Sequence, residues 1–363
     1  MLILRLIHRI LVGLNVLFAL LLVLTYVSVY INPEDFWFAA LYGLLYPFFL
    51  IVNLLFLFYW IFRWRKLVFI SFAAILLGVS HFNGFIRFPY GGAAKGSNPD
   101  LRVMTYNVNL FRLYSWSKLK PSYSDVFNYI KNNSFDVVCL QEFYLREGRL
   151  TLDQAKQQSG MNIYPSYILR RSNSAYGLAI LTNLPVVRTG EISFPNSFNA
   201  CMYADIVKGA DTIRVYNLHL QSTRLKERNF NFLLRNEFKL DSKNYDELKD
   251  LLSRLGVAFT KRARQVNMVV EHMRTCRYPI IICGDFNDSP VSYTYHTLTA
   301  SLHDTFKDAG SGVVVTFSGL WPSYRIDYVL RSRQFRTVSY QSPRLRYSDH
   351  YPVVVEVQLS GKR

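Results

Sequence analysis

The chain has 363 residues, of which half are hydrophobic and 16% are aromatic, and its 42 basic and 25 acidic residues give a formal net charge of +17. This length accommodates one large domain or two ordinary ones, and the aromatic content is high for a soluble protein. The four cysteines, Cys139, Cys201, Cys276 and Cys283, show no metal-ligand spacing, and we expect no disulfide framework among them, with a single bridge left open.

The charge is unevenly distributed along the chain. The first hundred residues contain only three acidic residues, Glu34, Asp35 and Asp100, whereas the rest has 35 basic and 22 acidic residues, or +13 by itself. A basic domain attracts polyanions such as nucleic acid, anionic lipid head groups or phosphorylated small molecules. The charge does not choose among these partners, and a solubilising role remains open.

Three uncharged apolar stretches lie in the first hundred residues, at about 10–31, 36–62 and 67–86. Each reaches the roughly 20 residues that a helix needs to cross a bilayer, so we predict three transmembrane helices within a membrane anchor at 1–88. A cleaved signal peptide is the alternative for the first stretch, but two further stretches follow it. Residues 89–100 are rich in glycine and small residues, which predicts a tether.

The basic residues of the anchor lie before the first stretch and between the second and third (Arg5, Arg9, Arg63, Arg65 and Lys66). The loop between the first two stretches instead contains Glu34 and Asp35. Because positively charged loops stay in the cytoplasm, we expect a multi-pass protein of the cytoplasmic (inner) membrane. Three crossings would then place residues 101–363 on the extracytoplasmic side.

From residue 101 onward, short apolar strands alternate with helices, and polar residues follow several strands where each one ends. Such runs are expected at 102–108, 137–140, 175–181, 202–207, 212–220, 279–283, 313–317, 325–330 and 353–359. Helices are expected at 123–132 and 261–274, with one or two more within the charged segment 223–259. The alternation favours a layered α/β or α+β architecture. Taken alone, Gly-Asp285-Phe-Asn287 fits either a strand-end turn or a catalytic corner.

Six motifs occur in a fixed order: Thr-Tyr-Asn107-Val-Asn109, Leu-Gln-Glu142, Tyr-Asn217-Leu-His219-Leu, Gly-Asp285-Phe-Asn287-Asp, Arg-Ile-Asp327-Tyr and Ser-Asp349-His350. From about residue 101 to the C-terminus this series resembles the endonuclease/exonuclease/phosphatase superfamily. Its members include abasic-site nucleases, DNase I-like nucleases, neutral sphingomyelinases and inositol-polyphosphate phosphatases. The resemblance implies an α/β fold, a four-layered DNase I-like sandwich with its site at one end of two packed sheets.

The resemblance also implies the role of each motif residue. Glu142 would hold Mg²⁺, or Mn²⁺ as an alternative, because a hard cation takes oxygen ligands, and Asn109 and Asp349 would help to hold it. Asp327 would orient His350. His219 would contact the phosphate, with Asn107 and Asn217 as further substrate-binding residues.

The implied reaction is the in-line hydrolysis of a phosphate ester. Asp285 would take the proton from the attacking water that Asn287 orients, and His350 and His219 would stabilise the charge that develops on the phosphate. Many nucleases of the superfamily have an aspartate where this chain has Asn109. The inositol-phosphatase branch has asparagine there, which tilts slightly away from a DNA enzyme.

The leading functional hypothesis is a membrane-anchored, Mg²⁺-dependent phosphoesterase that acts on a phosphodiester such as a lipid head group. An extracytoplasmic endonuclease or exonuclease is the alternative, since a basic surface suits nucleic acid equally well. A non-catalytic binding scaffold is a third possibility. The expected partners are the lipid bilayer and the phosphate-ester substrate, and no protein partner is implied.

Overall fold

The computed structural model describes residues 2–63, 65–88, 99–113, 120, 122–223, 242–318 and 325–360. Most of the predicted tether, 89–98, lies outside these residues. Residues 224–241, which belong to the segment 223–259 predicted to form one or two surface helices, also lie outside the described residues. The described remainder of that segment joins the helix predicted at 261–274 in one long helix, α10 (Ser242–Arg274).

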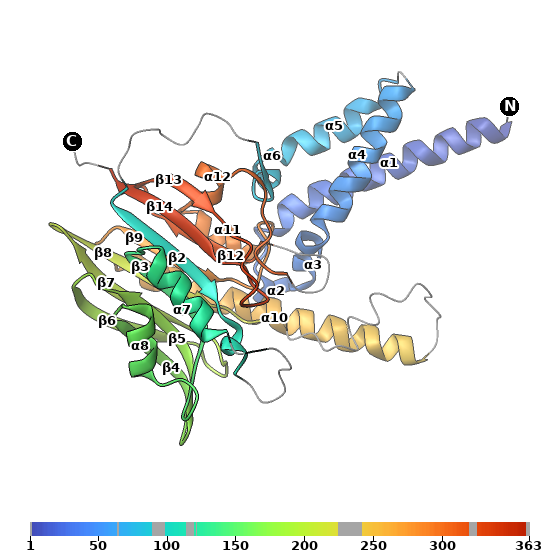
Figure 1. The fold of residues 1–363 in the computed structure, drawn as a ribbon. Helices are drawn as coiled ribbons and strands as arrows, with labels where there is room; N and C mark the ends of the chain where they lie inside the picture. The colour runs from blue at the N-terminus through green and yellow to red at the C-terminus, as the bar shows by residue number, and fades with distance from the viewer. Residues whose placement is uncertain are drawn as a thin grey trace.

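Two six-stranded mixed sheets form the centre of the molecule (Figure 1). The first has the order β13-β14-β2-β3-β5-β4, with β13 at Phe335–Gln341, β14 at Val353–Leu359, β2 at Leu101–Asn107, β3 at Val137–Arg146, β5 at Ser174–Thr182 and β4 at Ile163–Arg171. The second has the order β10-β12-β9-β8-β7-β6, with β10 at His303–Asp304, β12 at Asp327–Arg331, β9 at Ile280–Asp285, β8 at Asp211–His219, β7 at Ala200–Lys208 and β6 at Val186–Ser193.

The sheets pack face to face. Successive side chains of a central strand point to opposite faces of its sheet, and both of these faces are apolar. Val103 of β2 points into the layer between the sheets, where it meets residues such as Ile281 of the second sheet, while Met104 points to the opposite face. A strand whose successive side chains are all apolar must be covered on both sides. This explains why each sheet needs an outer layer of helices.

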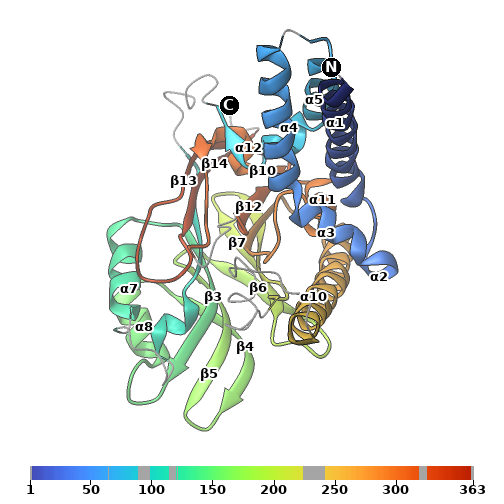
Figure 2. The same ribbon diagram turned by 90° about the vertical axis from the view of Figure 1, so that its right-hand side faces the viewer.

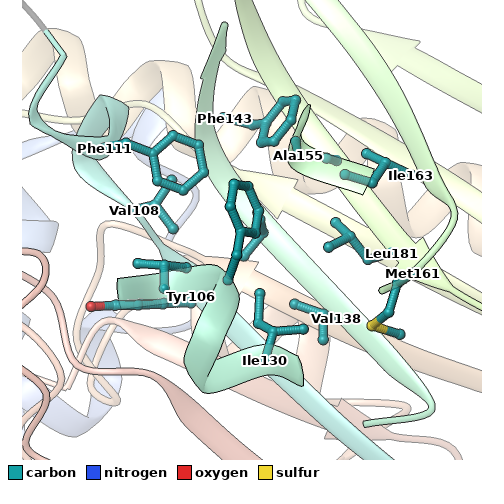
Figure 3. Packing of buried hydrophobic residues seen from close by; sticks show 14 of the residues in the cluster. Tyr106, Val108, Phe111, Ile130, Val138, Phe143, Ala155, Met161, Ile163 and Leu181 are labelled. Carbon is teal, nitrogen blue, oxygen red and sulfur yellow. The ribbon is translucent and has the colours of Figure 1, made fainter. Parts of the chain in front are cut away.

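Helices cover both outer faces. α7 (Tyr123–Asn132) and α8 (Leu152–Ser159) pack on the first sheet, and Figure 3 shows this core, in which Ile130 and Ala155 meet strand residues such as Val138. α10 and α11 (Tyr293–Thr299) cover the second sheet through apolar residues such as Val266 and Leu298. Figure 2 shows the resulting order of helix, sheet, sheet and helix. The four-layered α/β sandwich predicted from the motifs is confirmed.

Two small elements complete this part of the chain. α12 (Thr305–Ala309) follows β10, and β11 (Gly312–Val313) pairs with β1 (Ile86–Arg87) in a separate two-stranded sheet. The strand expected at 313–317 is therefore mostly irregular. The strand expected from residue 325 begins at Asp327.

The N-terminal region contains α1 (Leu2–Ser28), α2 (Pro33–Phe36), α3 (Phe38–Leu44), α4 (Tyr46–Phe62), α5 (Val68–Leu77) and α6 (Val79–Phe82). In Figure 1, α1, α4 and α5 lie side by side and point away from the sandwich. Their shared core is apolar and contains Leu22, Phe49 and Ala74. Many apolar side chains also remain on the outside of the group, among them Leu20, Leu55 and Leu77.

The prediction of three membrane-spanning helices requires correction. Among the described residues, only α1 is long and apolar enough on its own to cross a bilayer. The second predicted span is broken into α3 and α4, which bend by 53° at Leu45, just before Pro47, a residue that cannot continue a helical hydrogen-bond ladder. In the third, Gly78 ends α5 after 10 residues, or about 15 Å, half the thickness of the hydrocarbon core.

Candidate active site

The ends of four strands and a bulge in a fifth meet at one end of the sandwich. In the first sheet, Asn107 ends β2 and Glu142 lies on the parallel strand β3. In the second, His219 ends β8 opposite Asp285, the last residue of the parallel strand β9. Asp327 starts β12 and is paired with Asp285 in an antiparallel ladder. Because parallel strands end at the same edge, chain segments far apart in sequence deliver their polar side chains to one place.

Asp285 lies at the centre of this group and is 1% exposed. Its Oδ2 accepts a hydrogen bond from Asn107 Nδ2 at 3.0 Å and lies 3.8 Å from Nε2 of both His219 and His350. Its Oδ1 accepts the main-chain N–H of Asn287 at 2.8 Å. Burial and the nearby Asp327 carboxylate raise the pKa of Asp285, and the two histidines oppose this shift. A buried carboxylate with a raised pKa is suited to accept a proton.

His350 and Asp327 form the pair that the motifs predict. His350 Nδ1 lies 3.0 Å from Asp327 Oδ2, and both residues are buried. Burial by itself would lower the pKa of His350, but the carboxylates of Asp327 and Asp285 raise it to about 10. The two carboxylates therefore favour the imidazolium form of the ring, in which Nδ1–H donates to Asp327 and Nε2–H lies on the side of Asp285.

Glu142 occupies an irregular position in β3. The pairing of β3 with β5 shifts register between Leu140 and Phe143, and Glu142 has a φ of +52°. Such a bulge redirects a side chain, and strained backbone of this kind clusters at functional sites. Glu142 Oε1 lies 3.4 Å from Asn107 Nδ2 and 3.8 Å from His219 Nε2. Burial raises the pKa of Glu142 to about 7.

The turn after β9 is tightly constrained. Gly284 has a φ of +155°, and a Cβ at this position would overlap the main chain of Leu218 on the neighbouring strand β8. Asn287 has a φ of +52°, and its Nδ2 donates to the carbonyl of Leu220 at 2.9 Å. The sequence left two interpretations of this stretch open, a strand-end turn and a catalytic corner. Both describe one structure, because the turn holds Asp285 in place.

Asn217, predicted to bind substrate, lies beneath the site instead. It has no exposed surface, its Nδ2 donates to the carbonyls of Leu140 and Ala179, and its Oδ1 accepts from Gln141 Nε2 at 2.7 Å. These bonds use both amide hydrogens and join the two sheets. The substrate-binding prediction is therefore corrected, because a buried amide with committed hydrogens cannot reach a substrate.

Asn109 and Asp349 lie beside the central group. Asn109 opens a left-handed turn over Asn109–Arg112, and its main-chain N–H donates to Asn107 Oδ1 at 3.0 Å. Its described contact with the site thus runs through the main chain. The Asp349 carboxylate lies close enough to add to the raised pKa of Glu142.

Two residues outside the predicted set support the His350 pair. Thr316 Oγ1 accepts the N–H groups of Ile326 and Asp327 at 2.9 and 3.0 Å. Ser348 Oγ donates to the carbonyl of Asn107 at 2.8 Å. Ser348 belongs to the Ser-Asp-His motif and could have been selected from the sequence, whereas nothing in the sequence around Thr316 marks it.

Residues 104–350 match the model of the endonuclease/exonuclease/phosphatase family, and 8–85 match a family described as a domain of unknown function. The chain belongs to the endonuclease/exonuclease/phosphatase family. It is therefore a hydrolase that acts on phosphate esters. No curated protein sequence matches the chain.

Solved structures of this family share the fold. An endonuclease/exonuclease/phosphatase from Beutenbergia cavernae is 19% identical, with coverage of 73% of this chain and 72% of that one and a TM-score of 0.53. One from Bacteroides vulgatus is 16% identical, covering 72% and 99%, with a TM-score of 0.54. A mannosyl-6-phosphatase from Bacteroides thetaiotaomicron is 18% identical, covering 71% and 100%, with a TM-score of 0.50. At these identities the likeness concerns the fold alone.

Proteins of the endonuclease/exonuclease/phosphatase family generally use a divalent metal ion, and this site suits one. Glu142 and Asp349 present carboxylate oxygens, the ligands that hard divalent cations prefer. Burial raises the pKa of Glu142, and a bound cation would favour its ionised form. Asp285, Asp327 and His350 also place possible ligand atoms within 4.8 Å of one another. His350, however, pairs with Asp327 through Nδ1, so Glu142 is the better-suited ligand.

Proposed function

We propose that this chain is a membrane-associated phosphoesterase that requires a divalent cation, most simply Mg²⁺ with Mn²⁺ as an alternative, and hydrolyses a phosphodiester by in-line attack of water. One observation carries the proposal: a buried carboxylate, Asp285, with two imidazoles at 3.8 Å and an amide at 3.0 Å, beside a second carboxylate from the opposite sheet. Two carboxylates and two imidazoles around one point are suited to displacement at phosphorus.

Each residue has a part in this mechanism. Asp285 accepts the proton of the attacking water, and Asn287 orients that water. His350, held as an imidazolium by Asp327, and His219 stabilise the charge that develops on the phosphate oxygens. Asn107 Nδ2 donates to a carboxylate of each sheet and so holds Asp285 and Glu142 in position beside the substrate phosphate. A bound divalent cation would polarise the phosphoryl oxygens, and Glu142 would hold it, with Asp349 and Asn109 beside it.

We further propose that residues 1–88 attach the catalytic domain, 101–363, to the cytoplasmic membrane. The outward-facing apolar residues of α1 and α4 favour a lipid environment. Arg5 and Arg9 lie near the start of α1, and its other end adjoins the sandwich, where Tyr30 contacts His296. If α1 crosses the membrane with its basic end in the cytoplasm, the domain lies on the extracytoplasmic side, whatever path α4 and α5 follow.

The head group of a membrane lipid is the substrate that fits both proposals. The site lies near the apolar helices, since Val291, six residues after Asp285, packs in their shared core. Six residues span at most about 22 Å, so Asp285 lies within that distance of them. The phosphodiester groups of lipids lie at the bilayer surface, close to the end of a membrane-spanning helix, and so within about 22 Å of it.

The test uses the full chain in lipid nanodiscs and compares vesicles of a phosphodiester lipid, a soluble phosphate monoester, and single- and double-stranded DNA, each with Mg²⁺ or with chelator. We expect Mg²⁺-dependent release of the lipid head group. Asp285→Asn should lower the rate about 10³-fold, while the matched control Asp153→Asn, on an exposed face of α8, should retain it. Hydrolysis of DNA alone would favour a nuclease, and an unaffected Asp285→Asn would refute the mechanism.

A further inference from the structure

The apolar helices touch the loop that contains the proposed general base. An added Cβ at Gly43, in α3, would overlap the carbonyl oxygen of Val291, and one at Gly84 would lie 2.6 Å from Pro290 Cβ. Pro290 and Val291 follow Asp285 by five and six residues. Val291 is 1% exposed and, among the described residues from 99 onward, is the one that belongs to the buried cluster of α1, α4 and α5. The two surfaces approach so closely that a Cβ at either point would force its neighbour to shift.

The same helical region touches a second catalytic loop. Arg325 Nε donates to the carbonyl of Gly84 at 3.1 Å, and Arg325 precedes Asp327 by two residues. The guanidinium is 1% exposed and pairs with Asp304 through two hydrogen bonds of 3.0 and 2.6 Å. A buried, doubly hydrogen-bonded ion pair has little freedom to move, so Arg325 holds Gly84 and the start of β12 in a fixed relation.

The two catalytic loops are also bonded to each other. The N–H of Phe286 donates to the carbonyl of Ile326 at 2.9 Å, and Tyr328 Oη lies 2.7 Å from the carbonyl of Arg325 and 2.9 Å from that of Asp288. A displacement at one loop is therefore transmitted to the other. Gly84 lies against both of them.

A third contact involves α10, the helix that leads into β9. Trp37 packs on Gly256, the carbonyl of Pro33 accepts from Thr260 Oγ1 at 3.2 Å, and Glu34 pairs with Arg264 at 2.8 Å. Pro33, Glu34 and Trp37 belong to the short segment between α1 and α3. The helical region is thus seated on α10 as well as on the two loops.

From these contacts we infer that the N-terminal helices set the positions of Asp285 and Asp327, so that they are part of the catalytic unit as well as its attachment to a membrane. Gly43, Gly84 and Arg325 are the positioning residues, and none of them touches the reacting atoms. The inference rests on the proposed function, because it assigns the two aspartates their roles in hydrolysis. A misplacement of about 1 Å at a reacting group can cost about 10²-fold in rate.

The experiment uses the full chain in detergent micelles with Mg²⁺ and the soluble diester bis(p-nitrophenyl) phosphate, so that closeness to a membrane has no influence on the rate. Gly43→Ala and Gly84→Ala introduce a methyl group at the contact. Gly13→Ala is the matched control, because a Cβ at Gly13 in α1 meets nothing within 4 Å. Arg325→Lys keeps a positive charge beside Asp304 and removes the Nε donor to Gly84. Thermal unfolding of each variant is measured in parallel.

We expect kcat to fall about 10- to 100-fold in the three contact variants with KM within about twofold of the wild-type value, and Gly13→Ala to behave as wild type. Equal kcat in all folded variants, or a loss confined to KM, would overturn the inference and leave the proposed function standing. An inactive wild-type chain would overturn the proposed function and the inference with it. Gly84→Ala, in which the close contact is a side-chain atom, keeps the test decisive if Gly43→Ala does not fold.

Discussion

At the scale of single residues, the site depends on how its amide groups are used. Asn107 Nδ2 lies between a carboxylate of each sheet, at 3.0 Å from Asp285 and 3.4 Å from Glu142. Asn217, also on a strand near this edge, instead donates its amide hydrogens to two carbonyls beneath the site. The two asparagines are chemically identical and equally buried, and their hydrogen-bond partners decide that one contacts the carboxylates of the site and the other supports it from beneath.

Asp327→Asn tests whether Asp327 orients His350. An amide at this position cannot stabilise the imidazolium through charge and can present a donor to Nδ1, so the ring loses its orientation. We expect kcat to fall about 10- to 100-fold with an unchanged fold. The check is steady-state hydrolysis of a phosphodiester together with circular dichroism, and full activity of this variant would contradict the role given to Asp327.

Asp304→Asn tests the buried pair with Arg325. Burial would raise the pKa of Asp304, but Arg325 holds it below its ordinary value. A lowered pKa in the folded state contributes stability above the unfolded pKa of about 3.9, and this contribution is lost as pH falls through the folded value. We expect a loss of about 3–5 kcal/mol in unfolding free energy at pH 7.

Unfolding of the wild type and Asp304→Asn should be compared from pH 8 to pH 3. The difference between them should stay constant down to about pH 4 and shrink below it. A difference that grows as the solution becomes more acidic would contradict the assigned sign.

At the scale of elements, the site lies where regular structure is interrupted. β3 carries Glu142 on a bulge, Gly284 has a positive φ one residue before the end of β9, and the turn after β2 is left-handed over Asn109–Arg112. Each interruption redirects polar side chains from a strand toward a common point. Regular strands would have continued their alternation and directed half of these groups into the core.

Gly284→Ala tests this view for β9. Its methyl group would overlap the Leu218 main chain, and overpacking of this kind costs about 1–3 kcal/mol, to which the strain of the backbone conformation is added. Gly148→Ala is the control, since Gly148 also has a positive φ of +70° but has open space around it. Denaturant unfolding should show the larger loss for Gly284→Ala, and equal losses would mean that backbone conformation alone matters.

At the scale of the whole molecule, the helices and the sandwich share a tightly packed boundary. The basic residues Arg5 and Arg63 lie at the ends of α1 and α4 that point away from the sandwich, whereas Glu34 lies beside it (Figure 1). This separation of charge agrees with a cytoplasmic location for the far ends. The proposed orientation of the chain in the membrane can be tested in intact cells.

Val187→Cys, in β6 and 69% exposed, should react with a membrane-impermeant maleimide in intact cells if the sandwich is extracytoplasmic. Arg63→Cys, at the far end of α4, should react only after permeabilisation. Cys139, Cys201 and Cys283 are buried and Cys276 is partly exposed, so both variants carry Cys276→Ser and the chain with that change alone gives the background. Labelling of Arg63→Cys and not of Val187→Cys in intact cells would reverse the proposed orientation.

The sequence alone determined the layered fold and the residues that meet at its edge. Apolar runs end in Asn107, His219 and Asp285. A run of apolar residues indicates a strand that is buried on both faces, and the polar residue that follows it indicates where the strand ends, so neighbouring residues suffice for both predictions. The six ordered motifs then predicted the endonuclease/exonuclease/phosphatase family, to which the chain belongs.

Only the tertiary structure decided three other features. It showed that Asn217 is buried between the sheets, that the stretches at 36–62 and 67–86 are broken into shorter helices, and that Gly43 and Gly84 lie against the catalytic loops. Burial, helix bending and close approach depend on residues far away in the chain, and a local pattern of polarity contains no information about such partners.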